Sequence, residues 1–130
     1  MLVLDASVVV PACGARNGFA EFRRQELVAP PLMWSEARSA LHLAQWRGQA
    51  NRDDASIAQH RLEDCPVRLK NPKRIGETAW RLADELGWAR TYDAEYLALA
   101  ELMQCQLITL DSRLKRGTER LGYVISPSEL

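Results

Sequence analysis

The sequence predicts an α/β fold with a mainly parallel central sheet. Two short apolar runs, residues 1–5 and 106–110, are each closed by an aspartate, Asp5 and Asp111. An unbroken apolar run is typical of a strand buried on both faces, as strands are in parallel sheets. Further short apolar runs alternate with segments of helical spacing along the chain. This alternation indicates helices that connect and cover parallel strands.

Local signals set the boundaries of the predicted elements. Asn51 and Thr91 are suitable N-caps, and Gly48 and Gly87 end the helices that precede them. Pro11 opens or interrupts a helix that follows the first strand, before a loop over residues 14–18. The predicted strands are residues 1–5, 26–29, 67–69, 106–110 and 123–125. The predicted helices are residues 21–25, 32–47, 51–63, 72–86, 92–104 and 112–121.

Composition favours one domain over residues 1–130. The hydrophobic fraction of 47% is that of a packed globule and excludes a disordered chain. The 17 basic and 17 acidic residues cancel, which argues against a protein that grips duplex nucleic acid through many phosphates. No apolar run reaches the roughly 20 residues of a membrane span, and no cleaved signal peptide is expected. Three widely spaced cysteines suit neither a disulfide framework nor a zinc site, so we expect a reduced, cytoplasmic protein.

Asp5 and Asp111 are the first candidate functional residues. Each directly follows a predicted strand, so each is expected at the carboxyl edge of the sheet, where open α/β folds bind ligands. The alternative is that each aspartate only caps the helix that follows it.

Glu36 is the second kind of candidate, a carboxylate on an apolar helical stripe that we expect to face the core. The stripe is Leu32, Glu36, Ser39, Ala40, Leu43 and Trp46. A buried carboxylate is costly unless it is paired or coordinated. The alternative to a functional role is an ion pair with Arg38 or Arg113.

Asp93 has a similar position on its own predicted helix. It shares a stripe with Tyr96, Leu97 and Ala100, while Glu95 can face solvent. The alternative is that Asp93 only interacts favourably with the helix dipole in the first turn.

Four carboxylates gathered at one sheet edge would repel one another without a cation. Mg²⁺ or Mn²⁺ would suit them, because hard cations prefer oxygen ligands. Such ions can activate water and stabilise the leaving oxygen of a phosphodiester, which is nuclease chemistry. Spacing alone does not establish that the four side chains meet.

Four motifs in this order closely resemble the PIN-domain family, and within it the VapC-type toxins of type II toxin–antitoxin pairs. The motifs are Leu4-Asp5-Ala6-Ser7, Glu36 near the start of a helix, Thr91-Tyr-Asp93-Ala-Glu-Tyr-Leu-Ala-Leu-Ala100 and Leu107-Ile-Thr109-Leu-Asp111-Ser-Arg-Leu114. The resemblance covers nearly the whole chain. It implies a three-layer α/β/α sandwich and a Mg²⁺- or Mn²⁺-dependent endoribonuclease.

The resemblance also implies residue roles. The family's acidic quartet, which holds metal and is catalytic, corresponds to Asp5, Glu36, Asp93 and Asp111. Ser7 and Thr109 correspond to hydroxyl residues that bond the carboxylates or the water around the metal.

Basic residues follow Asp111 directly. Arg113, Lys115 and Arg116 are candidate RNA-phosphate contacts, and Arg113 is the strongest because it is nearest to the acidic cluster. The alternative is a solvated helix face with cations near its C-terminus. The two histidines, His42 and His60, are expected at the surface.

The resemblance implies three partners: an RNA substrate, a cognate antitoxin that lies across the active-site groove, and a second copy of the chain. Trp34, Leu41 and Trp46 could contribute to such a homodimer; the four tryptophans could also stack bases or fill a partner interface, although such residues are more often core or dimer contacts. No membrane partner is expected. The rival readings are a non-catalytic or a phosphoryl-transfer α/β domain that uses the acidic pocket to bind metal or a partner.

Overall fold

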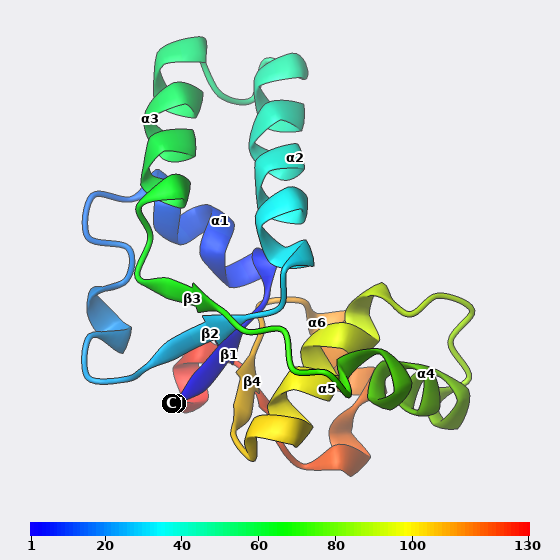
Figure 1. The fold of residues 1–130 in the computed structure, drawn as a ribbon. Helices are drawn as coiled ribbons and strands as arrows, with labels where there is room; N and C mark the ends of the chain where they lie inside the picture. Colours follow the sequence, from blue (N-terminus) through cyan, green and yellow to red (C-terminus); the bar gives the residue numbers. More distant parts are fainter.

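The computed structural model describes residues 1–130 and contains one five-stranded, wholly parallel sheet in the order β3-β2-β1-β4-β5 (Figure 1). The strands are β1 (Leu2–Leu4), β2 (Leu27–Ala29), β3 (Val67–Leu69), β4 (Gln106–Ile108) and β5 (Val124–Ile125). The predicted parallel sheet is therefore confirmed. The first and fourth strands end earlier than predicted, at Leu4 and Ile108; the amides of Asp5 and Thr109 still donate to the neighbouring strands, and their side chains bond each other.

Helices flank the sheet on both sides and form the expected α/β/α sandwich. They are α1 (Ala6–Gly14), α2 (Leu32–Trp46), α3 (Arg52–Glu63), α4 (Ile75–Leu86), α5 (Tyr92–Met103) and α6 (Ser112–Gly117). Short 3₁₀ turns occur at Ala20–Phe22, Glu119–Leu121 and Pro127–Glu129. Helices α1, α2 and α3 pack on one another, and α4 packs on α5, which in turn lies against β1 and β4 (Figure 1). None of the helices has the length and apolar character needed to cross a bilayer.

Several predicted boundaries are confirmed by the local geometry. The Asn51 side chain accepts a hydrogen bond from the Asp54 amide at 2.8 Å and caps α3. Gly87 ends α4 with a left-handed φ of 72°, a conformation that glycine adopts without a Cβ penalty. Pro11 lies inside α1, which continues past it to Gly14.

Other boundaries differ from the prediction. The basic helix expected over residues 112–121 ends at Gly117, because the buried Thr118 hydroxyl bonds the carbonyls of Leu114 and Lys115 and competes with the helical pattern. The helix expected from Pro72 begins at Ile75. Thr91 makes no side-chain capping bond to α5.

Only the start of the apolar stripe of α2 faces the core, where Leu32 packs against it and Glu36 is half-buried; the rest does not, contrary to our expectation. The buried residues of helix α2 are Met33 and Ala37, which lie outside the stripe. Within the stripe, Leu43 is 43% and Trp46 is 81% exposed. Helices α2 and α3 project beyond the sheet as a hairpin (Figure 1), so the outer half of α2 lies away from the sheet. The outer part of the stripe is left at the surface.

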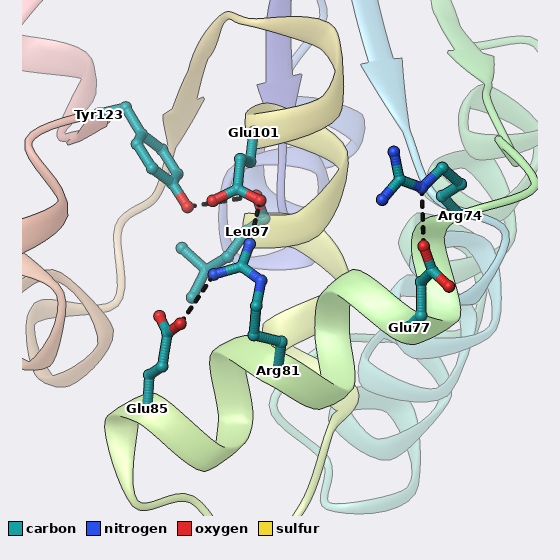
Figure 2. Close-up of polar contacts among 7 residues, drawn as sticks. All are labelled: Arg74, Glu77, Arg81, Glu85, Leu97, Glu101 and Tyr123. Carbon is teal, nitrogen blue, oxygen red and sulfur yellow. Dashed lines mark hydrogen bonds and ion pairs between the residues drawn. The ribbon is translucent and has the colours of Figure 1, made fainter.

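Polar contacts between α4 and α5 fix the helix that carries Asp93. Arg81 on α4 donates to Glu85 on the same helix at 2.9 Å and also pairs with Glu101 on α5 (Figure 2). Tyr123 directly precedes β5, and its hydroxyl donates to the carbonyl of Leu97 on α5 at 3.4 Å (Figure 2). These contacts join α5 to its neighbours on two sides.

Candidate active site

Asp5 is at the centre of the candidate site. It follows β1 and is only 6% exposed. The Ser7 hydroxyl donates to Oδ1 and the Thr109 hydroxyl to Oδ2, each at 2.5 Å. Burial raises the pKa of the Asp5 carboxyl, while the hydrogen bonds from Ser7 and Thr109 act in the opposite direction. Asp5 occupies the N-cap position of α1, but its side chain makes no capping hydrogen bond there and instead accepts from Ser7 and Thr109.

The hydroxyls of Ser7 and Thr109 are themselves held in place. Their oxygens lie 3.3 Å apart, the Leu110 amide donates to Ser7 Oγ at 2.9 Å, and the Asp111 amide donates to Thr109 Oγ1 at 3.0 Å. This arrangement follows from the sheet: β1 and β4 are neighbours, and Leu4 is paired with Ile108. The residues that follow these two therefore emerge side by side at the carboxyl edge.

Glu36 approaches the same edge from the first turns of α2. Its Oε1 accepts a hydrogen bond from the Tyr96 hydroxyl on α5 at 2.5 Å. Partial burial raises the pKa of the Glu36 carboxyl, and the carboxylates of Asp93, Asp5 and Glu95 raise it further against the effect of Tyr96. No arginine pairs with Glu36, so the expected alternative is wrong; Arg38 instead pairs with Glu63 at 2.9 Å.

Asp93 and Asp111 complete the set from α5 and from the start of α6. Both are exposed, so the expectation that Asp93 lies on a core-facing position is wrong. Desolvation of its carboxyl raises the pKa of Asp93, and the charge of Asp111 raises it further. Asp111 does cap a helix, because Oδ1 accepts from the amides of Arg113 at 2.9 Å and Leu114 at 3.2 Å, although a cap does not exclude a further role. Oδ2 of Asp111 accepts no hydrogen bond from the protein and stays available.

The four carboxylates are close enough to affect one another's charge. Asp5 and Asp93 both raise the pKa of Glu36, and Asp111 raises that of Asp93. No group of three or more His, Cys, Asp or Glu side chains is already arranged to hold a metal ion. The donor chemistry nevertheless fits a hard divalent cation, since every candidate ligand is a carboxylate oxygen and no basic side chain neutralises any of the four.

Tyr96 is a site residue that the sequence reasoning assigned only to an apolar stripe. It is 2% exposed, and its hydroxyl reaches Glu36 from one turn beyond Asp93. Two features of the sequence could have identified Tyr96. A buried tyrosine needs a hydrogen-bond partner for its hydroxyl, and Tyr96 is three residues from Asp93, so the two share a helix face.

The basic residues after Asp111 differ in whether their side chains form ion pairs. Arg113 and Arg116 are exposed and their side chains make no ion pair, whereas Lys115 pairs with Glu129 near the C-terminus. His42 and His60 are exposed, as expected.

Comparison with known proteins gives a consistent result. The PIN domain family model matches residues 2–119. Ribonuclease VapC9 of Mycobacterium tuberculosis is 31% identical over 116 residues, which cover 88% of this chain and 88% of that protein. VapC ribonuclease Mb0985 of Mycobacterium bovis matches to the same extent, 31% over 116 residues.

Solved structures share the fold at lower sequence identity. PAE2754 from Pyrobaculum aerophilum has a TM-score of 0.76 and 24% identity, covering 98% of this chain and 91% of that one. A chain of a toxin–antitoxin complex from Klebsiella pneumoniae has a TM-score of 0.64 and 18% identity, covering 98% of both chains. VapC20 of Mycobacterium tuberculosis, a Sarcin-Ricin loop cleaving toxin, has a TM-score of 0.64 and 17% identity, covering 95% of this chain and 97% of that one.

Proposed function

Because this chain belongs to the PIN-domain family, we propose that it is a Mg²⁺- or Mn²⁺-dependent endoribonuclease and the toxin of a toxin–antitoxin pair. The observation that carries the proposal is the set of electrostatically coupled carboxylates at the carboxyl edge of the sheet, where no basic side chain neutralises them. Its place of action would be the cytoplasm.

Asp5, Glu36, Asp93 and Asp111 are the proposed metal ligands and catalytic residues. When bound, a divalent ion supplies the activation of water and the stabilisation of the leaving oxygen in phosphodiester hydrolysis. Asp5 is suited to be the fixed ligand, because two hydroxyls orient its carboxylate before any ion binds. Ser7 and Thr109 would keep that orientation during turnover.

Glu36 and Asp111 have different proposed tasks. Glu36 is held at one oxygen by Tyr96, so its other oxygen is free to bind a second ion or to orient the attacking water. Asp111 keeps Oδ2 free for the metal or for water near it, while Oδ1 caps α6.

RNA would approach over the basic residues that follow Asp111. Arg113 and Arg116 are the proposed phosphate contacts, since both are exposed and unpaired. Lys115 is also proposed, although it would first have to release Glu129.

The exposed apolar stripe beside Glu36 supports an antitoxin partner. A shallow pocket of about 460 Å³ is lined by Glu36 together with Ala40 and Leu43. We propose that an antitoxin segment covers this stripe and directs a basic side chain toward the carboxylates. Trp46, which is 81% exposed at the end of the stripe, is available for this contact or for the proposed homodimer.

The experiment that tests the proposal is cleavage of total RNA by antitoxin-free protein in Mg²⁺, in Mn²⁺ and in EDTA. Asp5→Asn is the inactive variant, and Asp84→Asn, an exposed aspartate on α4, is the matched control. We expect discrete RNA fragments from the wild type and from Asp84→Asn in metal only. Folded protein that neither cleaves RNA nor binds Mn²⁺ would overturn the proposal and favour a non-catalytic role.

A further inference from the structure

A second cavity lies away from the carboxylates, at the far end of α1. It has a volume of about 830 Å³, and none of the four carboxylates lines it. Helix α1 begins directly after Asp5 and has 9 residues, so its far end is about 14 Å from the candidate active site. Ala12, near that end, forms part of the cavity wall.

Apolar side chains form much of the cavity wall. Phe19 lines it from the segment that connects α1 to β2, Leu27 lines it from the start of β2, and Ile57 lines it from α3. Ile57 is 48% exposed, so its side chain is accessible from the cavity. A ligand with an apolar body would cover this surface.

The charged residues around the cavity are mostly arginines. Arg16, Arg23 and Arg61 line it, and Asp64 is its one carboxylate. None of these four residues makes an ion pair, in a chain whose total charge is zero. The cavity therefore carries a local positive excess that the protein itself does not neutralise.

Two contacts give the cavity a fixed shape. The half-buried Arg61 donates from Nη1 to the carbonyl of Cys13 at 3.1 Å, which orients its guanidinium at the cavity. Gly18 packs so tightly on α1 that a Cβ there would lie 1.9 Å from the carbonyl oxygen of Ala12. The segment that carries Arg16 and Phe19 is thus held against the helix.

We propose that this cavity binds a small amphipathic anion, with an aliphatic or aromatic body and a carboxylate or phosphate head. The body would lie on Phe19, Leu27 and Ile57, and the head would meet the arginines. Guanidinium groups bind both kinds of head group through paired hydrogen bonds. The volume is within the roughly 300–1,000 Å³ range of small-molecule sites.

The test uses decanoate and decyl phosphate as probes, each titrated below its micelle-forming concentration and followed by amide chemical shifts of the full chain. Decyltrimethylammonium has a body of the same length and the opposite charge, and inorganic phosphate has no body. We expect saturable shifts confined to residues 15–27 and 57–66 for one or both anions, and none at Asp93 or Asp111. The anion that binds with the higher affinity identifies the preferred head group.

Two variants make the test decisive. Arg16→Gln/Arg23→Gln removes two exposed arginines and should weaken binding by about tenfold or more, as expected for lost charge-assisted hydrogen bonds. Arg47→Gln/Arg90→Gln makes the same charge change away from the cavity and should leave binding unchanged. Ile57→Asp, at an exposed helix position, should abolish it.

Equal binding of the ammonium probe, equal loss in both double variants, or no saturable binding of either anion would overturn the proposal. None of these results depends on RNA cleavage.

Discussion

The Tyr96 hydroxyl donates to Glu36 Oε1 at 2.5 Å and joins α5 to α2 across the edge of the sheet. Tyr96 is buried and Glu36 is half-buried, so the bond orients a carboxylate that has no basic partner. The two residues are 60 positions apart in the chain. The helix that carries Asp93 therefore also determines where Glu36 points.

Tyr96→Phe should separate this orienting role from simple packing. Because the ring is kept and only the hydroxyl is lost, the free energy of unfolding should fall by no more than about 1–2 kcal/mol. Mn²⁺ affinity, measured by calorimetry, should fall together with RNA cleavage. Leu82→Ala, a core substitution on α4, is the control that should lower stability at least as much without weakening Mn²⁺ binding. Unchanged Mn²⁺ affinity in Tyr96→Phe would contradict the role.

Asp5→Asn should abolish RNA cleavage and stabilise the fold at neutral pH. Burial raises the folded-state pKa of Asp5, so the unfolded chain releases this proton first and the free energy of unfolding falls as the pH rises through the two values. An uncharged amide avoids that cost, so we expect the free energy of unfolding to rise at pH 7. Thermal unfolding at pH 7 and near pH 4 checks the result, because the gain should shrink in acid. A loss of stability at pH 7 would mean that the bonds from Ser7 and Thr109 outweigh the burial.

Cys13 should make the protein less stable in alkaline solution. Burial raises the pKa of this thiol from 9.0 to about 11, so between these values the unfolded chain binds fewer protons than the folded one. The contribution of Cys13 to stability is thus complete below pH 9.0 and is lost as the pH rises to about 11, a fall of about 3 kcal/mol. Urea unfolding of the wild type and of Cys13→Ala at several pH values tests this. Parallel pH profiles for the two proteins would count against it.

Arg113→Ala should weaken RNA binding without loss of metal. Its side chain is exposed and unpaired beside Asp111, and only its backbone amide contributes to the helix cap. Lys115→Ala should have a smaller effect, since Lys115 already pairs with Glu129. Binding can be measured in the Asp5→Asn background, where RNA stays intact, and Mn²⁺ binding of each single variant by calorimetry. Equal effects of the two substitutions would show that the ion pair does not restrain Lys115.

Much of the fold could be predicted because its signals are local. The cap at Asn51 and the left-handed turn at Gly87 depend on residues within a few positions of each other. The buried strands are equally predictable from the sequence. Strands of a parallel sheet are buried on both faces, so β1 and β4 are short apolar runs without alternating polar residues.

The wrong predictions concern segments whose structure depends on packing against distant parts of the chain. Helical spacing identifies the stripe of α2 but not what covers it, and the hairpin geometry leaves Leu43 and Trp46 uncovered. Similarly, the residues after Asp111 form a continuous helical pattern, but the buried Thr118 hydroxyl ends the helix.

The candidate site could be predicted only in part. The positions of Asp5 and Thr109 follow from neighbouring strands, whereas the bond between Glu36 and Tyr96 depends on how two helices pack. The assignment of metal-binding roles to the four carboxylates came from the family resemblance and stays a prediction.

The bond between Thr109 and Asp5 also has a consequence for protein synthesis. These two residues are 104 positions apart, so Asp5 is translated well before Thr109. A nascent chain on the ribosome can form the local bond from Ser7 to Asp5, but it gains the second bond only after Thr109 has left the exit tunnel and β4 has paired with β1. Translation products that stop before β4 would thus lack both the Thr109 bond and the Asp111 carboxylate of the candidate site.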